Sequence, residues 1–287
     1  MKPKAKTLAS FETAHGQPKI QRMERELAVE RAKVAALSDV QDKVRRIDAK
    51  DNRLTFGLFG DTQIGSLYSA QECWLAFADH CACRGCTEMY HTGDVLDGHR
   101  VYKGQEFELS DVGMEKQLDR LAKVAPKVGL PVRFIVGNHD LSLKALAGVN
   151  IGKAISDRMD DAGQDWEFLG EESAVVEIAT PIGKTFRMQL LHPGGGSSYA
   201  ISYRMQKIIE SLEGGTKPDL LAIGHYHKAE MLPNYRNVCG VQTGCFQWQS
   251  PFMARNALAA HVGGWIIDVT VGEDLLSVRG EFVAFFR

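Results

Sequence analysis

Five short polar clusters in this sequence contain the side chains that are best suited to bind metal ions. Each cluster directly follows an apolar run, and together they supply carboxylate, amide and imidazole groups. Such mixed oxygen and nitrogen donors suit Mn, Fe, Zn or Ni better than a calcium cage or a thiolate site. The clusters are Asp61 with Gln63, Asp94 with Asp97, Asn138 with His139, His192, and His225 with His227.

The spacing of these residues indicates how they could meet. The apolar run before each cluster is typical of a β-strand, and ligand sites in open α/β folds assemble at the carboxyl ends of strands. Alternate residues of an extended segment point the same way, so Asp61 and Gln63 can face one site. The two histidines of the fifth cluster have the same spacing. A single His192 would more often be an ordinary buried histidine, but its place among four other clusters favours a ligand.

The elements that would position the clusters alternate between strands and helices from residue 54 onwards. Strands are predicted at 54–59, 87–91 and 131–136, and helices at 69–82, 111–128 and 152–160. The second half is richer in strands, which are predicted at 174–179, 185–191, 219–223, 238–243, 264–271 and 280–286, with one helix at 198–212. This order favours an α/β sandwich of two sheets with flanking helices.

The N-terminal part of the chain differs in composition from the rest. Residues 18–37 are rich in helix formers, and a polar linker at 48–53 follows them. Residues 1–50 contain twelve Lys and Arg and seven Asp and Glu, a net charge of +5, against −2 for the whole chain. We therefore predict a helical arm and linker at 1–53 and one catalytic domain at 54–287. Docking, dimerisation and DNA contact remain open as roles for the arm.

Composition sets limits on where the protein works. No apolar run approaches the ~20 residues of a membrane span, and no apolar stretch follows the basic N-terminus as in a secretory signal. The six cysteines do not form a disulfide framework for a chain of this length. Cys81, Cys83 and Cys86 could form part of a zinc knuckle, but no fourth ligand of matching spacing follows, so free thiols are the preferred interpretation. These features predict a cytoplasmic protein that does not bind membranes.

The order and content of the five clusters resemble the calcineurin-like metallophosphoesterase superfamily, in particular its prokaryotic and phage-encoded, exonuclease-like branch. Its members share the pattern Asp-x-His, Gly-Asp-x-x-Asp, Gly-Asn-His-Asp/Glu, His and Gly-His-x-His, and the resemblance covers residues 54–245. It implies a four-layer α/β/β/α sandwich of two mixed sheets with a dinuclear metal centre. One ion would be held by Asp61, Gln63, Asp94 and His227, and the other by Asp94, Asn138, His192 and His225, with Asp94 bridging.

The same resemblance implies a hydrolase of phosphate esters that uses a bridging hydroxide on two divalent ions. Manganese is the favoured ion, with Fe, Zn, Ni and Mg as alternatives. His139 would stabilise or protonate the leaving oxygen. Asp97, or Asp140 in its place, would accept a hydrogen bond from the other ring nitrogen of His139. Gln63 stands where the family usually has a histidine. Because a neutral amide oxygen is a weaker ligand than imidazole, the site that contains Gln63 is predicted to be the looser one.

Two segments are candidates for substrate contact. Arg100 and Tyr102 lie in an insertion directly after the Gly-Asp-x-x-Asp motif, and Tyr199 follows the Gly-rich turn after His192. The resemblance to the exonuclease-like branch implies a phosphodiesterase or nuclease that acts on DNA or nucleotides, distantly similar to DNA-repair nucleases of the SbcD type. The alternatives are a phosphomonoesterase or small-molecule phosphodiesterase, and an inactive metallophosphoesterase fold that serves as a scaffold. The oligomeric state is not predicted.

Overall fold

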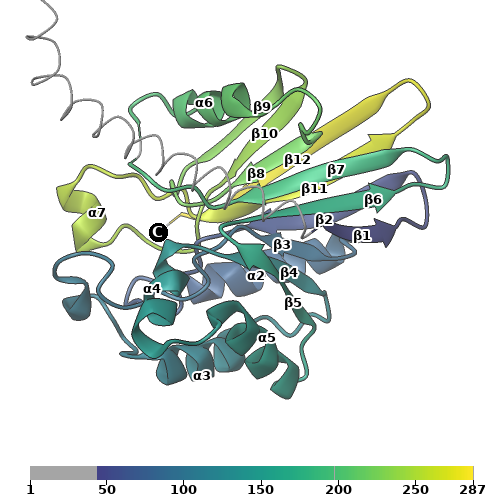
Figure 1. Ribbon diagram of the computed structural model, residues 1–287. Coiled ribbons are helices and arrows are strands. Elements are labelled where there is room, and N and C mark those ends of the chain that lie inside the picture. Colours follow the sequence, from purple (N-terminus) through teal and green to yellow (C-terminus); the bar gives the residue numbers. More distant parts are fainter. Residues whose placement is uncertain (1–43, 197, 287) are drawn as a thin grey trace, which may run out of the picture. The chain divides into compact units, whose positions relative to one another are not determined.

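Two six-stranded mixed β-sheets pack face to face in the part of the chain that the computed structural model describes, residues 44–196 and 198–286 (Figure 1). The first sheet has the strand order β12-β11-β2-β3-β4-β5. Its strands β2 to β5 are parallel, and β11 and β12 extend it as antiparallel neighbours. The strands are β2 (Arg53–Phe59), β3 (Met89–His91), β4 (Val132–Val136), β5 (Trp166–Glu171), β11 (Gly263–Val271) and β12 (Leu276–Ala284).

The second sheet has the order β1-β6-β7-β8-β10-β9. Within it, β1 and β6, β7 and β8, and β8 and β10 pair in parallel, whereas β6 with β7 and β9 with β10 pair antiparallel. The strands are β1 (Val44–Asp48), β6 (Ser173–Ala179), β7 (Thr185–Leu191), β8 (Leu220–Ile223), β9 (Ala229–Tyr235) and β10 (Val238–Thr243).

Helices cover the outer face of each sheet, which confirms the predicted four layers. Helices α2, α4 and α5 pack on the first sheet and α3 packs on α5, whereas α6 packs on β10 of the second sheet (Figure 1). The helices are α2 (Gln71–Cys83), α3 (Met114–Val124), α4 (Asn138–Ala147), α5 (Ile151–Asp161), α6 (Tyr203–Ser211), the short α7 (Pro251–Arg255) and a 3₁₀ turn at Gln105–Phe107. None of the helices in the described ranges is both long enough and apolar enough to span a bilayer.

The layers follow from the two-residue alternation of apolar side chains along the strands. In β2, Phe56 and Leu58 belong to the core between the two sheets, whereas Phe59 belongs to the core under the helices. In β8, Leu220 faces the other sheet and Leu221 faces α6. Strands that are apolar on both faces are buried on both faces, so the sequence of β2 and β8 already requires a covering layer on each side.

The structure differs from the sequence predictions at several elements. Strand β1 lies within the region assigned to arm and linker, and it pairs with β6 from Val44 to Asp48, so this part of the chain belongs to the second sheet. The predicted helical arm at 18–37 lies outside the described residues. Strand β12 begins four residues before the predicted start at 280. Strands β5 and β9 and helices α4 and α7 were not predicted.

The cysteine trio is divided between the core and the surface. Cys81 and Cys86 are buried and Cys83 is exposed, and all three are free. No cysteine belongs to a potential metal-binding group among the described residues. The sequence preference for free thiols over a zinc knuckle agrees with this arrangement.

Candidate metal centre

The five polar clusters meet where central strands of both sheets end. Strands β2, β3 and β4 of the first sheet and β7 and β8 of the second lead directly into them. Asn138 is the first residue of α4 and does not lie in a loop, so its cluster joins a strand to a helix. The site is therefore built from the middle of both sheets, where the surrounding strands restrict movement of the backbone.

The backbone at the site adopts an uncommon conformation. Five predicted ligands, none of them glycine, lie in the left-handed region of φ. Such residues cost about 1–3 kcal/mol each and occur where the surrounding structure enforces them, often at functional sites. We had expected Asp61 and Gln63 to face one site because their segment would be extended. The segment is not extended, so this reason was wrong. The residues and φ angles are Asp61 (51°), Gln63 (47°), Asp94 (55°), His225 (75°) and His227 (53°).

Asp94 lies at the centre of the cluster. Its Oδ2 atom is 3.2 Å from Gln63 Nε2 and 3.2 Å from His192 Nε2. Its Oδ1 atom accepts a hydrogen bond of 2.9 Å from the backbone N–H of His139. Gln63 and His192 belong to different predicted ligand sets, so the Asp94 carboxylate touches both halves of the predicted centre.

Hydrogen bonds orient the histidine rings. The Nδ1 atom of His192 lies 2.8 Å from the carbonyl oxygen of Thr92, which places Nε2 next to Asn138 Oδ1 at 3.1 Å. The Nε2 atom of His225 lies 2.8 Å from the carbonyl oxygen of Gly195. Because a carbonyl oxygen accepts only, each ring donates there, which leaves the other ring nitrogen as the potential metal ligand.

The second half of the predicted centre contains Asp61. Its fully buried carboxylate accepts hydrogen bonds from the backbone N–H of His225 at 3.0 and 3.2 Å. His227 Nε2 lies 3.2 Å from Asp61 Oδ1. Asp61, which follows β2, therefore contacts both histidines that follow β8, and the two sheets are joined through the site.

The donor set fits divalent metal ions. Asp94, His192 and His225 each offer a ligand atom, and these atoms lie within 4.8 Å of one another. The Gln63 Oε1 atom is buried and has no hydrogen-bond partner among the described residues, which is unusual for a buried amide oxygen. Two carboxylates, Asp61 and Asp94, are almost completely buried. Buried charges of one sign need a counter-charge, and cations held between these groups would supply it.

Burial and charge act in opposite directions on the ionisable groups around the site. Burial lowers the pKa of His192, but the carboxylates of Asp94 and Asp61 and the carbonyl oxygen of Thr92 together raise it to about 9. Burial raises the pKa of Asp97 to about 6, against the effect of His139, which lowers it.

His91 is fully buried, and burial lowers its pKa to about 3, so its ring is neutral. Its Nδ1 atom accepts from Gly93 N–H and its Nε2 donates to Thr62 Oγ1, which links the ends of β2 and β3.

His139 is held by the segment that contains Asp97. Its Nδ1 atom lies 2.7 Å from the backbone carbonyl oxygen of Asp97 and 3.8 Å from the carboxylate Oδ1. The predicted partner of His139 was the Asp97 carboxylate. The structure shows instead that the main hydrogen bond of His139 is to the backbone carbonyl oxygen of Asp97.

Asp140 accepts hydrogen bonds from three backbone N–H groups, those of Val95, Leu96 and Gly137, and so it fixes the strand ends.

A cavity of about 280 Å³ opens beside this cluster. Asp94, Asn138 and His139 contribute to its lining, together with a group of apolar residues that forms an apolar wall. Of the three predicted substrate contacts, Tyr102 lines the cavity, whereas Arg100 and Tyr199 are exposed and do not. The wall that sequence reasoning missed comes from the segment around α7 and contains Phe252, Met253, Leu258 and Ala259. Its short apolar run, Pro-Phe-Met-Ala, carries no motif that would have marked it.

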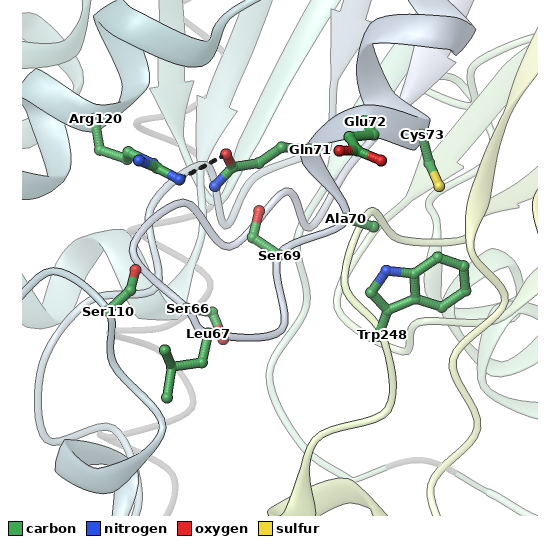
Figure 2. Close-up of a pocket in the computed structure, with 10 residues that line it drawn as sticks. All are labelled: Ser66, Leu67, Ser69, Ala70, Gln71, Glu72, Cys73, Ser110, Arg120 and Trp248. Atoms are coloured by element: carbon green, nitrogen blue, oxygen red, sulfur yellow. Dashed lines mark hydrogen bonds between the residues drawn. The ribbon is translucent and has the colours of Figure 1, made fainter. Parts of the chain in front are cut away.

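A second hollow of about 370 Å³ lies at the start of α2 (Figure 2). None of the predicted site residues lines it. Arg120 reaches its rim, but Arg120 Nη2 donates to Gln71 Oε1 at 3.0 Å (Figure 2). We therefore place the candidate site at the cavity beside Asp94.

Known proteins with related sequences and folds provide a comparison. The small subunit of DNA polymerase II from Halobacterium salinarum is 24% identical over 250 residues, which cover 70% of this chain and 45% of that protein. The chain thus spans about half the length of the curated relatives that it matches. A dimetal phosphatase from Danio rerio is 12% identical with a TM-score of 0.42, over 80% of this chain and 98% of that one. Zinc-bound Vps29 from Entamoeba histolytica is 15% identical with a TM-score of 0.38, over 80% and 99%.

The family comparison covers most of the chain. The model of the calcineurin-like phosphoesterase family matches residues 32–229. This range contains all seven predicted metal ligands together with His139 and Asp97. The chain therefore belongs to the calcineurin-like phosphoesterase family.

Proposed function

We propose that this protein is a metal-dependent hydrolase that cleaves phosphodiesters of DNA or nucleotides, with manganese as its preferred ion. The observation that carries the choice of diester is the composition of the cavity. Among the described residues, neither lysine nor arginine lines it. A phosphate monoester carries about −1.5 to −2 charges at neutral pH, and proteins usually bind such groups with Arg or Lys. A diester carries a single charge, which suits a cavity without basic side chains.

The curated relatives support a nucleic-acid or nucleotide substrate. The relatives from Halobacterium salinarum are small subunits of a DNA polymerase. Because identity is 24% and the match covers 45% of those proteins, this likeness supports the chemical class of substrate and not a shared role.

The predicted ligands divide into two sets that share Asp94. When bound, divalent ions activate water and neutralise the charge that develops on phosphate oxygens. The chain itself holds the ligand atoms in place, because carbonyl oxygens orient His192 and His225 and backbone N–H groups orient the Asp61 and Asp94 carboxylates. The proposed sets are Asp61, Gln63, Asp94 and His227, and Asp94, Asn138, His192 and His225.

His139 is the proposed proton donor to the leaving oxygen. Its Nδ1 atom is bound to the Asp97 carbonyl oxygen, and its Nε2 atom lies 4.0 Å from Asp94 Oδ2, on the side of the cavity. Imidazole can hold and release a proton near neutral pH. A protonated ring in this position can therefore donate from Nε2 to an ester oxygen bound beside Asp94.

The test compares bis-p-nitrophenyl phosphate with p-nitrophenyl phosphate in the presence of Mn, Mg, Zn, Ni or Fe(II). We expect a higher kcat/KM for the diester and the highest rate with Mn. His139→Ala should lower kcat on the diester by about 10²–10⁴-fold, the range for a general acid.

Other outcomes separate the alternatives. A preference for the monoester would overturn the diester proposal in favour of a phosphomonoesterase. Equal rates for the wild type and His139→Ala would overturn the role of His139. No turnover of either ester with any of the ions would favour the scaffold.

A further inference from the structure

The apolar wall of the cavity is built from two segments that are far apart in the sequence. Tyr102 lies in the insertion after β3, and Phe252 lies in α7. Their rings stack with centroids 4.1 Å apart and an interplanar angle of 22°. Both side chains line the cavity, and Met253 and Leu258 extend the apolar surface. The wall therefore presents aromatic and aliphatic carbon to whatever occupies the cavity.

A buried carboxylate holds the two segments together. Glu108 is 5% exposed. Its Oε2 atom accepts a hydrogen bond of 2.9 Å from the Tyr102 hydroxyl, and its Oε1 atom accepts one of 3.1 Å from the backbone N–H of Phe252. Charged acceptors make the stronger class of hydrogen bond. The aromatic pair is thus fixed before substrate arrives, which lowers the entropy cost of binding against it.

The wall borders the group proposed to act on the leaving oxygen. The Tyr102 ring lies 6.4 Å, between centroids, from the His139 ring and meets it edge to face. A phosphorus atom bound beside Asp94 would therefore have an apolar surface next to one of its ester substituents. A cavity of about 280 Å³ is at the lower end for small-molecule sites, which suits one small substituent and not a duplex.

We infer that Tyr102, Phe252 and Leu258 form a subsite that selects phosphodiesters carrying an unpaired nucleobase on the side of the leaving group. This inference rests on the proposed phosphodiesterase function and adds a determinant of specificity to it. Nucleobases bind proteins by stacking on aromatic side chains, with little dependence on the identity of the base. The subsite contains no charged side chain among the described residues that line the wall, so it would distinguish substrates by the apolar face of the base.

The experiment uses the full chain with Mn and three substrates. These are dithymidine monophosphate and its two analogues in which one or the other thymidine is replaced by an abasic tetrahydrofuran residue. The ester oxygens remain alkyl oxygens in all three, so intrinsic reactivity is matched. We expect kcat/KM for the dinucleotide to exceed kcat/KM for the analogue that lacks the base on the leaving-group side by about fivefold or more, as expected for the loss of one stacked base.

Matched variants locate the selection. Phe252→Ala should reduce the ratio of dinucleotide to analogue toward one. Glu108→Gln, which leaves the rings in place but removes one strong acceptor, should reduce it in part. Phe107→Ala is the control, because Phe107 lies in the same insertion, is 82% exposed and does not line the cavity. It should keep the wild-type ratio. Because each ratio is measured within one variant, partial loss of folded protein cancels.

Failure of the subsite and failure of the proposed function give different results. Equal kcat/KM for all three substrates in the wild type would overturn the subsite alone, as would an unchanged ratio in Phe252→Ala. Turnover of bis-p-nitrophenyl phosphate with no turnover of any of the three would also overturn it. Absence of turnover on every diester, bis-p-nitrophenyl phosphate included, would overturn the proposed function as well.

Discussion

Glycines directly before the predicted ligands keep space open for them. A Cβ atom added at Gly137 would lie 2.3 Å from Asp94 Oδ1 and 2.6 Å from His192 Nε2. One added at Gly93, which has a φ of 96°, would lie 2.7 Å from His192 Nδ1. The motifs Gly-Asp and Gly-Asn-His therefore include glycine because any larger residue would displace the predicted metal ligands Asp94 and His192.

The change Gly137→Ala tests this explanation. We expect it to lower metal affinity and activity by about 10–100-fold, the range for groups that orient metal ligands, because Asp94 and His192 must move apart. The measurement is bound metal per chain, with kcat/KM for a diester. Gly214→Ala is the control, since no atom lies within 4 Å of its Cβ position. Equal metal content in the two variants would contradict the explanation.

As a ligand, Gln63 would make the two halves of the predicted centre unequal. Gln63→His replaces a neutral oxygen with the imidazole that the family usually has at this position. We expect the Mn concentration for half-maximal activity to fall by about tenfold, whereas Gln63→Ala should raise it. The measurement is activity across a titration of Mn into chelator-treated protein. If Gln63→Ala left the titration unchanged, Gln63 would not be a ligand.

At the scale of elements, an ion-pair network joins β1 to the first sheet. Arg45 of β1 contacts Glu167 of β5 at 2.9 Å and Glu88 before β3 at 3.3 Å. Arg133 of β4 contacts the same two glutamates at 3.3 and 3.4 Å and makes two hydrogen bonds to Asp165. The network crosses from one sheet to the other, so it contributes to the position of β1 at the edge of the second sheet.

We expect Arg133→Met to lower the free energy of unfolding by about 1–3 kcal/mol. Its side chain is 10% exposed, and its removal leaves Glu88, which is 13% exposed, with a weaker counter-charge. Urea unfolding followed by circular dichroism measures the change. Arg46→Met is the matched control, because the Arg46 side chain is 78% exposed and its pair with Glu177 should contribute less than about 1 kcal/mol. Equal effects of the two changes would contradict a structural role for the network.

At the scale of the whole molecule, the candidate metal ligands come from both sheets, so metal binding would hold the two sheets together. Asp61 and Asp94 follow strands of the first sheet, and His192 and His225 follow strands of the second. Ions that bind all four would stabilise the folded state and leave the unfolded chain unaffected. We expect Mn at about 100 times its dissociation constant to add about 2.7 kcal/mol and to raise Tm by about 5–10 °C.

Thermal unfolding with Mn and with excess chelator measures this shift. Asp94→Asn should reduce the shift, because Asn offers a neutral ligand to both halves of the centre. A Tm that does not depend on Mn would contradict a metal centre between the sheets.

The candidate metal ligands could be predicted from the sequence because each polar cluster directly follows the strand that positions it. The order of apolar runs and polar clusters predicted a sandwich of two sheets with flanking helices and the residues that meet at the strand ends. The family resemblance that the clusters carry implied mixed sheets in four layers. The boundaries of β7 and β10 agree with those predicted. Membership of the phosphoesterase family followed from the same clusters.

Contacts between distant segments were decided only by the tertiary structure. The sequence Val-Arg-Arg-Ile-Asp of β1 lacks a strong apolar run, and it becomes a strand because it pairs with β6. The left-handed backbone at Asp94 and His225 was not predicted, because Asp and His adopt it more often than most residue types but still only in a minority of cases. Phe252 comes to stack on Tyr102 because buried Glu108 binds both segments. The sequence by itself thus determined the groups that do the chemistry, and packing between remote segments determined the wall that those groups face.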